Sequence, residues 1–159
     1  MERLSDLVID GKENGLPGAV LFACNMNAVR SPMAAALLQH LAGRRTYVES
    51  AGVRPGEPDH FAAAVMDEIG IDISRHRPHS LDDLNDTSFD LVITLAPEAH
   101  HKALEMTRTM SVDVEYWPTP DPTAAVGSRE QILDAYRAVR DGLLRRIKQR
   151  FPYYGTPQV

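Results

Sequence analysis

Short apolar runs alternate with longer amphipathic stretches along this chain. The run at 19–24, Ala-Val-Leu-Phe-Ala-Cys, has the length and the uninterrupted apolar character of a buried strand. Three further stretches, 46–51, 89–95 and 112–117, are predicted as strands, and 89–95 is apolar enough to be covered on both faces. The stretch 112–117 is the weakest of the four because polar residues interrupt it.

Helices are predicted in the intervals between these strands. Their expected positions are 31–43, 58–68, 97–106 and 128–149. Ser31 is the expected cap of the first helix, Pro32 suits its first turn, and Gly43 marks its end.

Apolar residues at helical spacing form a stripe on two of these helices. The stripe of the 58–68 helix is Ala62, Val65, Met66 and Ile69, and that of the last helix is Ile132, Leu133, Tyr136, Val139, Leu143, Leu144 and Ile147. The last helix also carries six cations, which we expect mostly to face solvent: Arg137, Arg140, Arg145, Arg146, Lys148 and Arg150. Strands alternating with helices predict a three-layer α/β fold, in which helices cover both faces of a doubly wound parallel sheet.

Composition places this pattern in one compact domain. The chain has 159 residues, so we expect a single domain over 18–159 and an N-terminal extension over 1–17. No apolar run reaches the roughly 18–20 residues of a membrane span, and no secretory signal precedes the first strand, so we expect a cytoplasmic protein. The net charge of −5 argues against nucleic acid or an anionic membrane as partner. The pattern leaves the oligomeric state open.

The chain contains one cysteine, Cys24. An internal disulfide and a multi-cysteine metal site are therefore excluded. His76 and His79 are spaced for one helix face but lack a third ligand, and His100 and His101 point to different faces. We expect neither a metal nor another cofactor.

The loop after the first strand carries the chemistry. Its sequence is Cys24-Asn25-Met26-Asn27-Ala28-Val29-Arg30-Ser31-Pro32. Such a loop can curl so that its backbone N–H groups point inward and, with the following helix N-terminus, bind an anion. Arg30 can hold two oxygens of a tetrahedral oxyanion, the same field favours the thiolate of Cys24, and Ser31 can donate to the sulfur. The simpler alternative is a buried Cys24 and a solvated Arg30.

A second candidate group lies in the proline-rich segment 117–123. A thiolate that displaces an alkoxide needs a proton donor behind the leaving oxygen. Asp121 fits that role, because neighbouring prolines restrict its backbone. An ordinary Asp-Pro turn is the alternative interpretation.

Together these motifs resemble the low-molecular-weight protein tyrosine phosphatase family, which also includes arsenate reductases. The resemblance covers about residues 18–150 and rests on Cys24-x5-Arg30-Ser31-Pro32, Ser50-Ala51-Gly52, Gly56-x-Pro58, Gly70-Ile71-Asp72-Ile73-Ser74-x-His76 and Asp121-Pro122. It implies a four-stranded parallel sheet in the order 2-1-3-4, no metal and a cysteinyl-phosphate intermediate. Asn27 matches an asparagine that braces the loop in this family, although a simple turn residue would also fit.

Three departures from the family pattern bear on function. Met26 stands where the family usually has glycine, so the loop must accept a bulkier residue or bend differently. Val29 replaces a second cysteine of eukaryotic members, which removes their protective disulfide. Thr123-Ala124 and 53–55 (Val-Arg-Pro) replace aromatic residues that often wall a phosphotyrosine site.

We therefore expect a phosphomonoester hydrolase with Cys24 as nucleophile, Asp121 as general acid and base, and a phosphate-binding loop formed by Asn25 to Ser31. Its expected substrate is a phosphate monoester, with a phosphotyrosine protein implied by the resemblance alone. One alternative is an arsenate reductase that uses an external thiol, because Cys24 has no partner cysteine for an internal relay. Another alternative is a phosphocysteine carrier, which has little use for Arg30 or Asp121.

Overall fold

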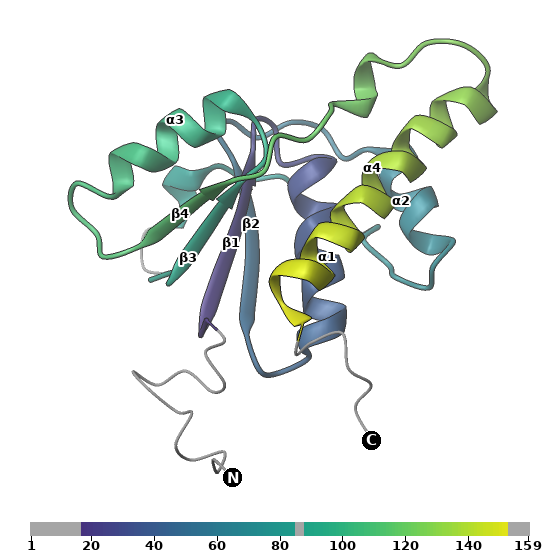
Figure 1. Cartoon of the computed structure of the whole chain (residues 1–159). Coiled ribbons are helices and arrows are strands. Elements are labelled where there is room, and N and C mark those ends of the chain that lie inside the picture. Colours follow the sequence, from purple (N-terminus) through teal and green to yellow (C-terminus); the bar gives the residue numbers. More distant parts are fainter. Residues whose placement is uncertain (1–16, 85–87, 153–159) are drawn as a thin grey trace, which may run out of the picture.

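One parallel sheet forms the centre of the molecule. The structure is a computed structural model that describes residues 17–84 and 88–152. Its strands are β1 (Ala19–Cys24), β2 (Tyr47–Gly52), β3 (Leu91–Thr94) and β4 (Asp113–Tyr116), in the order β2-β1-β3-β4 (Figure 1). All neighbouring pairs are parallel, which confirms the predicted sheet and its order. Apart from Pro17, the predicted extension 1–17 lies outside the described residues, so the domain division stays a prediction.

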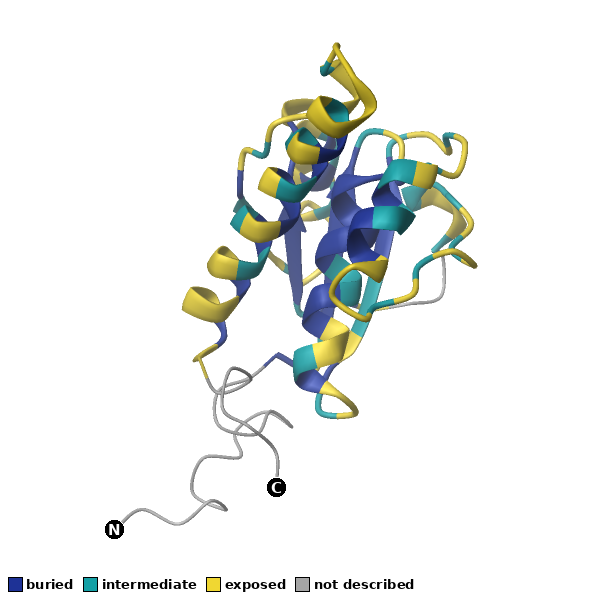
Figure 2. Cartoon of the chain, turned by 90° about the vertical axis from the view of Figure 1, so that its right-hand side faces the viewer, coloured by how far each residue is buried: buried dark blue, intermediate teal, exposed yellow. Residues whose placement is uncertain are grey.

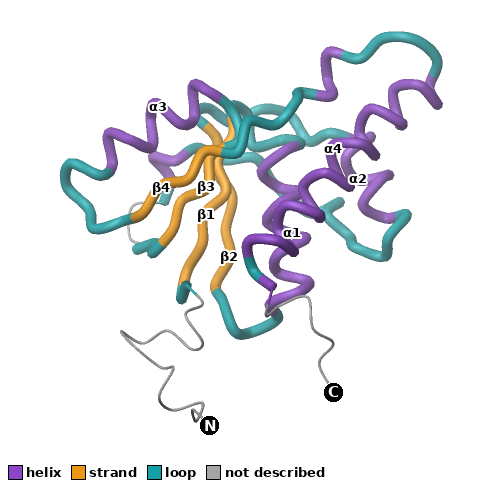
Figure 3. Tube along the Cα trace, in the orientation of Figure 1, coloured by secondary structure: helices purple, strands orange, loops and turns teal. Residues whose placement is uncertain are grey.

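Helices cover both faces of the sheet, as predicted (Figure 3). They are α1 (Arg30–Ala42), α2 (His60–Asp67), α3 (Pro97–Met106) and α4 (Arg129–Arg150), with two short 3₁₀ helices, η3 (Leu81–Asp83) and η4 (Pro122–Ala124). α1, α2 and α4 lie on one side, and α3 lies on the other. α4 packs against α1 and α2 and shares the larger buried cluster with them and with residues of β1 and β3.

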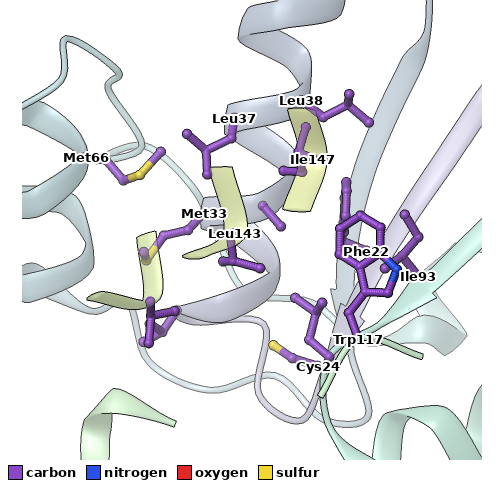
Figure 4. Packing of buried hydrophobic residues seen from close by; sticks show 14 of the residues in the cluster. Phe22, Cys24, Met33, Leu37, Leu38, Met66, Ile93, Trp117, Leu143 and Ile147 are labelled. Atoms are coloured by element: carbon purple, nitrogen blue, oxygen red, sulfur yellow. The ribbon is translucent and has the colours of Figure 1, made fainter. Parts of the chain in front are cut away.

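The alternation of side chains along β1 divides the core between the two faces. Val20, Phe22 and Cys24 belong to the larger cluster beneath α1, α2 and α4, whereas Leu21 belongs to a smaller cluster beneath α3. Figure 4 shows part of the larger cluster, including Phe22 and Cys24 from β1. Figure 2 shows that buried residues occupy the inward sides of the helices and exposed residues their outward sides. Cys24 is therefore both a core residue and the last residue of its strand.

The start of α1 differs from the prediction. The helix begins at Arg30, and its N-cap Val29 provides no side-chain hydrogen bond. Ser31 was expected to cap this helix, but it lies inside the first turn, and its hydroxyl contacts the preceding loop instead. The predicted end at Gly43 is confirmed, because this residue has a φ of 60° and its N–H bonds to Gln39.

The helix α2 starts and ends inside the predicted interval. Asp59 caps it by accepting a hydrogen bond from the N–H of Ala62, which delays the start from residue 58 to His60. Ile69 lies beyond the end of the helix and is 39% exposed, so its assignment to the apolar stripe was wrong. The other three residues of that stripe are buried, as expected.

Two cations of α4 bind other residues of the protein, although we expected the cations of this helix mostly to face solvent. Arg140 is only 8% exposed; its guanidinium donates to Val65 O at 2.7 Å and to Glu68 Oε1 at 2.8 Å. Arg137 binds the same carboxylate at 2.7 Å through Nη2. These contacts join α4 to the end of α2, so this part of the basic helix is structural.

The carboxyl ends of the strands meet at one edge of the sheet. Cys24 pairs in register with Gly52, and Thr94 pairs with Tyr116. The chain runs from β1 to β2 on one side and later returns to β3 on the other side of β1, so the loop after β1 lies where the direction of winding reverses. Ligands of doubly wound sheets bind at this place. No helix within 17–84 and 88–152 is long and apolar enough to cross a membrane.

Candidate active site

The sulfur of Cys24 lies in a network of polar side chains at the end of β1. Cys24 is 2% exposed, and its Sγ lies 3.0 Å from Ser31 Oγ. Ser31 Oγ accepts a hydrogen bond from Asn27 Nδ2 at 2.9 Å, so its own proton is directed elsewhere. The available acceptors are the sulfur and, more distantly at 3.4 Å, Ala51 O. When the sulfur is a thiolate, the Ser31 hydroxyl can donate to it, and the negative charge gains a partner.

Asn27 holds the loop in its shape. It is fully buried and has a φ of 54°, a left-handed conformation that asparagine tolerates better than most residues. Its Nδ2 also donates to Ser50 Oγ at 2.9 Å, while its Oδ1 accepts from the N–H of His79 at 3.0 Å. His76 Nε2 donates to the Asn27 carbonyl at 2.8 Å. The loop is thus braced from β2 and from the segment before η3.

The His76 and His79 pair therefore has a structural use, in contacts that the sequence did not reveal. Burial of the His76 ring lowers its pKa, which favours the neutral form that donates through Nε2. Within 17–84 and 88–152, no group of three or more potential metal-binding side chains comes together.

The first three backbone carbonyls of the loop bind the segment that follows β2. Those of Cys24, Asn25 and Met26 accept hydrogen bonds of 3.1, 3.0 and 2.9 Å from the N–H groups of Val53, Arg54 and Gly56. By contrast, none of the N–H groups of residues 25–29 donates to another residue of the described chain. Backbone N–H groups left without protein acceptors in a partly buried loop are suited to bind an anion.

Met26 is accommodated where the related pattern has glycine. Asn27 is the one non-glycine residue with positive φ in the described chain, so Met26 needs no conformation reserved for glycine. Its side chain is 42% exposed and lies against Gly56, where an added Cβ would be 2.9 Å from Met26 Cβ. The absence of a side chain at Gly56 therefore makes the space that Met26 occupies.

Arg30 joins the loop to the segment that follows β4. It is 8% exposed, its Nη1 donates to Thr119 O at 3.0 Å, and its Nη2 lies 3.9 Å from Asp121 Oδ2. These contacts fix the guanidinium near the cavity before any ligand is bound. A fixed guanidinium loses less entropy when it binds an oxyanion.

Asp121 is held by its own segment. Its Oδ1 accepts hydrogen bonds from Thr123 N at 3.0 Å and Thr123 Oγ1 at 2.7 Å, which caps η4. Partial burial raises the pKa of Asp121, but the two bonds from Thr123 and the charge of Arg30 together outweigh it, so the pKa is lower than usual. Asp121 is therefore ionised at neutral pH, and an anion bound nearby would raise its pKa.

One small cavity brings the three main candidates together. Cys24, Arg30 and Asp121 all line it, and its volume is about 190 Å³. Of the other predicted loop residues, Met26, Ala28 and Val29 also line it, whereas Asn25, Asn27 and Ser31 do not. The contribution of Asn27 and Ser31 is the network behind the sulfur.

The cavity wall also contains two residues that the sequence did not single out. Glu57 and Asp59 line it together with Gly56 and Thr123. Asp59 is engaged, since its Oδ2 accepts from Tyr136 Oη at 2.8 Å besides capping α2. The only available signal was the Gly56-x-Pro58 motif, which marks this segment without showing which side chains face the cavity. None of the described residues lining this cavity is aromatic.

The fold and this loop define a class: α/β proteins that hold a cysteine in an anion-binding loop at the carboxyl edge of a parallel sheet. The family model for low molecular weight phosphotyrosine protein phosphatase matches residues 19–151, and the chain belongs to this family. The expectation drawn from its motifs is therefore confirmed at the level of the family.

Known relatives differ in activity. The arsenate reductase of Bacillus subtilis is 33% identical over 130 residues, which cover 82% of this chain and 92% of that protein. A solved arsenate reductase in its phosphate binding state is 27% identical, with a TM-score of 0.66 and coverage of 86% and 98%. The low molecular weight protein tyrosine phosphatase of T. tengcongensis is 26% identical, with a TM-score of 0.68 and coverage of 85% and 98%. The family therefore contains both activities that the sequence suggested.

Proposed function

We propose that this protein is a phosphomonoester hydrolase that acts through a cysteinyl-phosphate on Cys24. The observation that supports this proposal is that Cys24, Arg30 and Asp121 line one cavity of about 190 Å³. This is the size of site that admits a phosphoryl group and the first part of its ester. The unpaired N–H groups of residues 25–29 supply further donors for the phosphate oxygens.

In the first step, the Cys24 thiolate attacks phosphorus. A sulfur–phosphorus bond forms, the phosphorus–oxygen bond to the alcohol breaks, and a proton passes from Asp121 to the leaving oxygen. In the second step, Asp121 takes a proton from water, the resulting hydroxide attacks phosphorus, and the sulfur leaves as thiolate with inorganic phosphate as product. The Ser31 hydroxyl stabilises the sulfur anion before the first step and after the second.

The wall of the cavity favours esters other than phosphotyrosine. Ring stacking needs aromatic side chains, whereas Met26, Glu57 and Thr123 stand at this wall. We therefore place a general phosphate monoester ahead of a phosphotyrosine protein as substrate.

Arsenate reduction is the second candidate, and the relatives named as arsenate reductases favour it over ester hydrolysis. The single cysteine of this chain adds the requirement for an external thiol. Arsenate would condense with Cys24 and lose water. An external thiolate would then attack Cys24 Sγ, forming a disulfide while arsenic leaves with two electrons as arsenite. A second thiol would restore Cys24. Because Cys24 is the only cysteine of the chain and is 2% exposed, a small thiol suits this route better than an internal relay.

The two candidates are separated by parallel assays of the purified protein and its Cys24→Ser variant. Aryl phosphate, phosphotyrosine peptide, and arsenate with a small thiol are supplied to each. We expect native protein to release phosphate from the aryl ester, and Cys24→Ser to lose this activity while keeping the native circular dichroism spectrum and melting temperature.

Arsenite production without ester hydrolysis would assign the protein to the reductases instead. Ester hydrolysis that survives in the Cys24→Ser variant would refute the cysteinyl-phosphate mechanism altogether.

A further inference from the structure

A second cavity is larger than the one that contains Cys24. It has a volume of about 620 Å³ and lies between the proline-rich segment 117–125 and the middle of α4. Of the three residues Cys24, Arg30 and Asp121, only Asp121 lines this groove as well as the catalytic cavity. Its size falls within the range of sites for small organic ligands.

The groove exists because small residues face one another across it. Ala124 and Ala125 line it from one side, and Ala135, Ala138 and Gly142 line it from α4. None of these side chains is large enough to fill the space between the segment and the helix. Pro118, Pro120 and Pro122 line the same side of the groove as Ala124 and Ala125, across from α4. Their fixed φ angles keep this wall in place without a ligand.

The groove is lined by one cationic and one anionic side chain. Arg146 lines it, with its guanidinium 5.0 Å from the centre of the Trp117 ring, and no described carboxylate pairs with Arg146. The carboxylate of Asp121 also lines the groove. An anionic group would be attracted to Arg146 and repelled by Asp121, while an apolar body would contact the alanines and prolines between them.

We propose that this groove is a second ligand site, which takes a small molecule with an apolar body and one anionic group. The groove shares Asp121 with the catalytic cavity but contains neither Cys24 nor Arg30, so we expect its occupation and the binding of phosphate to be compatible. The proposal does not depend on which reaction Cys24 performs.

The test measures the affinity of the full-length protein for 1-anilinonaphthalene-8-sulfonate by fluorescence titration. The uncharged N-phenyl-1-naphthylamine is titrated in the same way for comparison. Ala138 is exposed on α4, so an Ala138→Trp substitution places a large ring in the groove with little disturbance of the core. We expect it to weaken binding of the sulfonate at least about tenfold. Arg146→Gln should weaken the sulfonate alone, by about two- to fivefold, as expected for one exposed charge pair.

The matched control is Arg145→Gln, which removes the same charge from the neighbouring position of α4 but does not line the groove. It should leave both affinities unchanged, and saturating inorganic phosphate should not displace the probe. Equal binding by native protein and a folded Ala138→Trp variant would overturn the proposal. So would displacement by phosphate, which would place the probe in the catalytic cavity, or a change of oligomeric state in Ala138→Trp, which would make the groove an interface between copies.

Discussion

At the scale of single residues, one hydroxyl group connects the structure of the loop with its chemistry. Ser31 Oγ accepts from Asn27 Nδ2 at 2.9 Å and lies 3.0 Å from Cys24 Sγ. Because Asn27 occupies one acceptor site of the hydroxyl, the hydroxyl proton is free to turn towards the sulfur. The residue that fixes the left-handed turn therefore also orients the group that stabilises the proposed nucleophile.

Replacing Asp121 tests the proposed proton transfer. Asp121→Asn keeps the shape of the side chain but removes its acid and base function. We expect kcat/KM, which reports the step in which the leaving oxygen departs, to fall by about 10²–10⁴ for esters with poor leaving groups and much less for esters with good ones. Steady-state kinetics over a series of aryl and alkyl phosphates measures this dependence. A uniform loss across the series would mean that another group protonates the leaving oxygen.

Thr123 provides a prediction of pH dependence. Its hydroxyl donates to Asp121 Oδ1 at 2.7 Å and contributes to the lowered pKa of that carboxyl group. Thr123→Val removes this bond, so the pKa of Asp121 should rise and the acid should keep its proton to higher pH. The alkaline limb of the kcat profile is therefore expected to move to higher pH. Thr109→Val, an exposed change outside both cavities, serves as control, and an unmoved limb in Thr123→Val would contradict the role of this bond.

At the scale of elements, the loops after β1 and β2 form one unit. The N–H groups of Val53, Arg54 and Gly56 bind the carbonyls of residues 24–26, whereas the N–H groups of residues 25–29 bind no acceptor in the described chain. Gly52 is the closest point of contact, where an added Cβ would lie 2.8 Å from both Asn25 O and Asn27 N. The Ser50-Ala51-Gly52 motif thus has a packing reason as well as a family resemblance.

These contacts explain what the sequence could and could not predict. The strand 19–24 and the helix 97–106 have the predicted bounds, because local signals mark them: an uninterrupted apolar run for the strand and a proline in the first turn of the helix. Ser31 was misassigned as a cap, because a local rule places serine at helix starts while its hydroxyl is engaged by Cys24 and Asn27. Glu57 and Asp59 were missed at the cavity, because their placement depends on pairing between two loops that lie far apart in the sequence.

Gly52→Ala tests this pairing. The added methyl group would collide with backbone atoms, which cannot move as a flexible side chain can. We expect a loss of stability of about 1–3 kcal/mol and a larger loss of phosphate affinity, measured by urea denaturation and by inhibition with inorganic phosphate. The control is Gly142→Ala in α4, where the nearest atom to the new Cβ is Arg145 Nη2 at 3.7 Å. Unaltered phosphate affinity in Gly52→Ala would show that the two loops are not coupled.

At the scale of the whole molecule, an ion cluster fastens the last helix to the rest of the fold. Glu68, at the end of α2, accepts hydrogen bonds from Arg137 and Arg140 of α4. α4 in turn forms one wall of the larger groove and packs against α1, the helix that begins at Arg30. The position of the site thus depends on a contact far from it in the sequence.

This cluster should make stability depend on pH in the acid range. The hydrogen bonds from Arg137, and then those from Arg140, lower the pKa of Glu68 from 4.5 to about 2 in the folded protein. Since the unfolded chain keeps the higher pKa, the contribution of Glu68 is complete above about pH 4.5 and is lost as pH falls towards 2. We expect Glu68→Gln to be less stable than native protein at pH 6, with the difference shrinking at pH 3, as measured by urea denaturation. Glu105→Gln, which removes an exposed carboxylate of α3 that has no described cation partner, should show no such trend. A difference between Glu68→Gln and native protein that stays constant from pH 6 to pH 3 would show that the ionised carboxylate does not fasten α4 to α2.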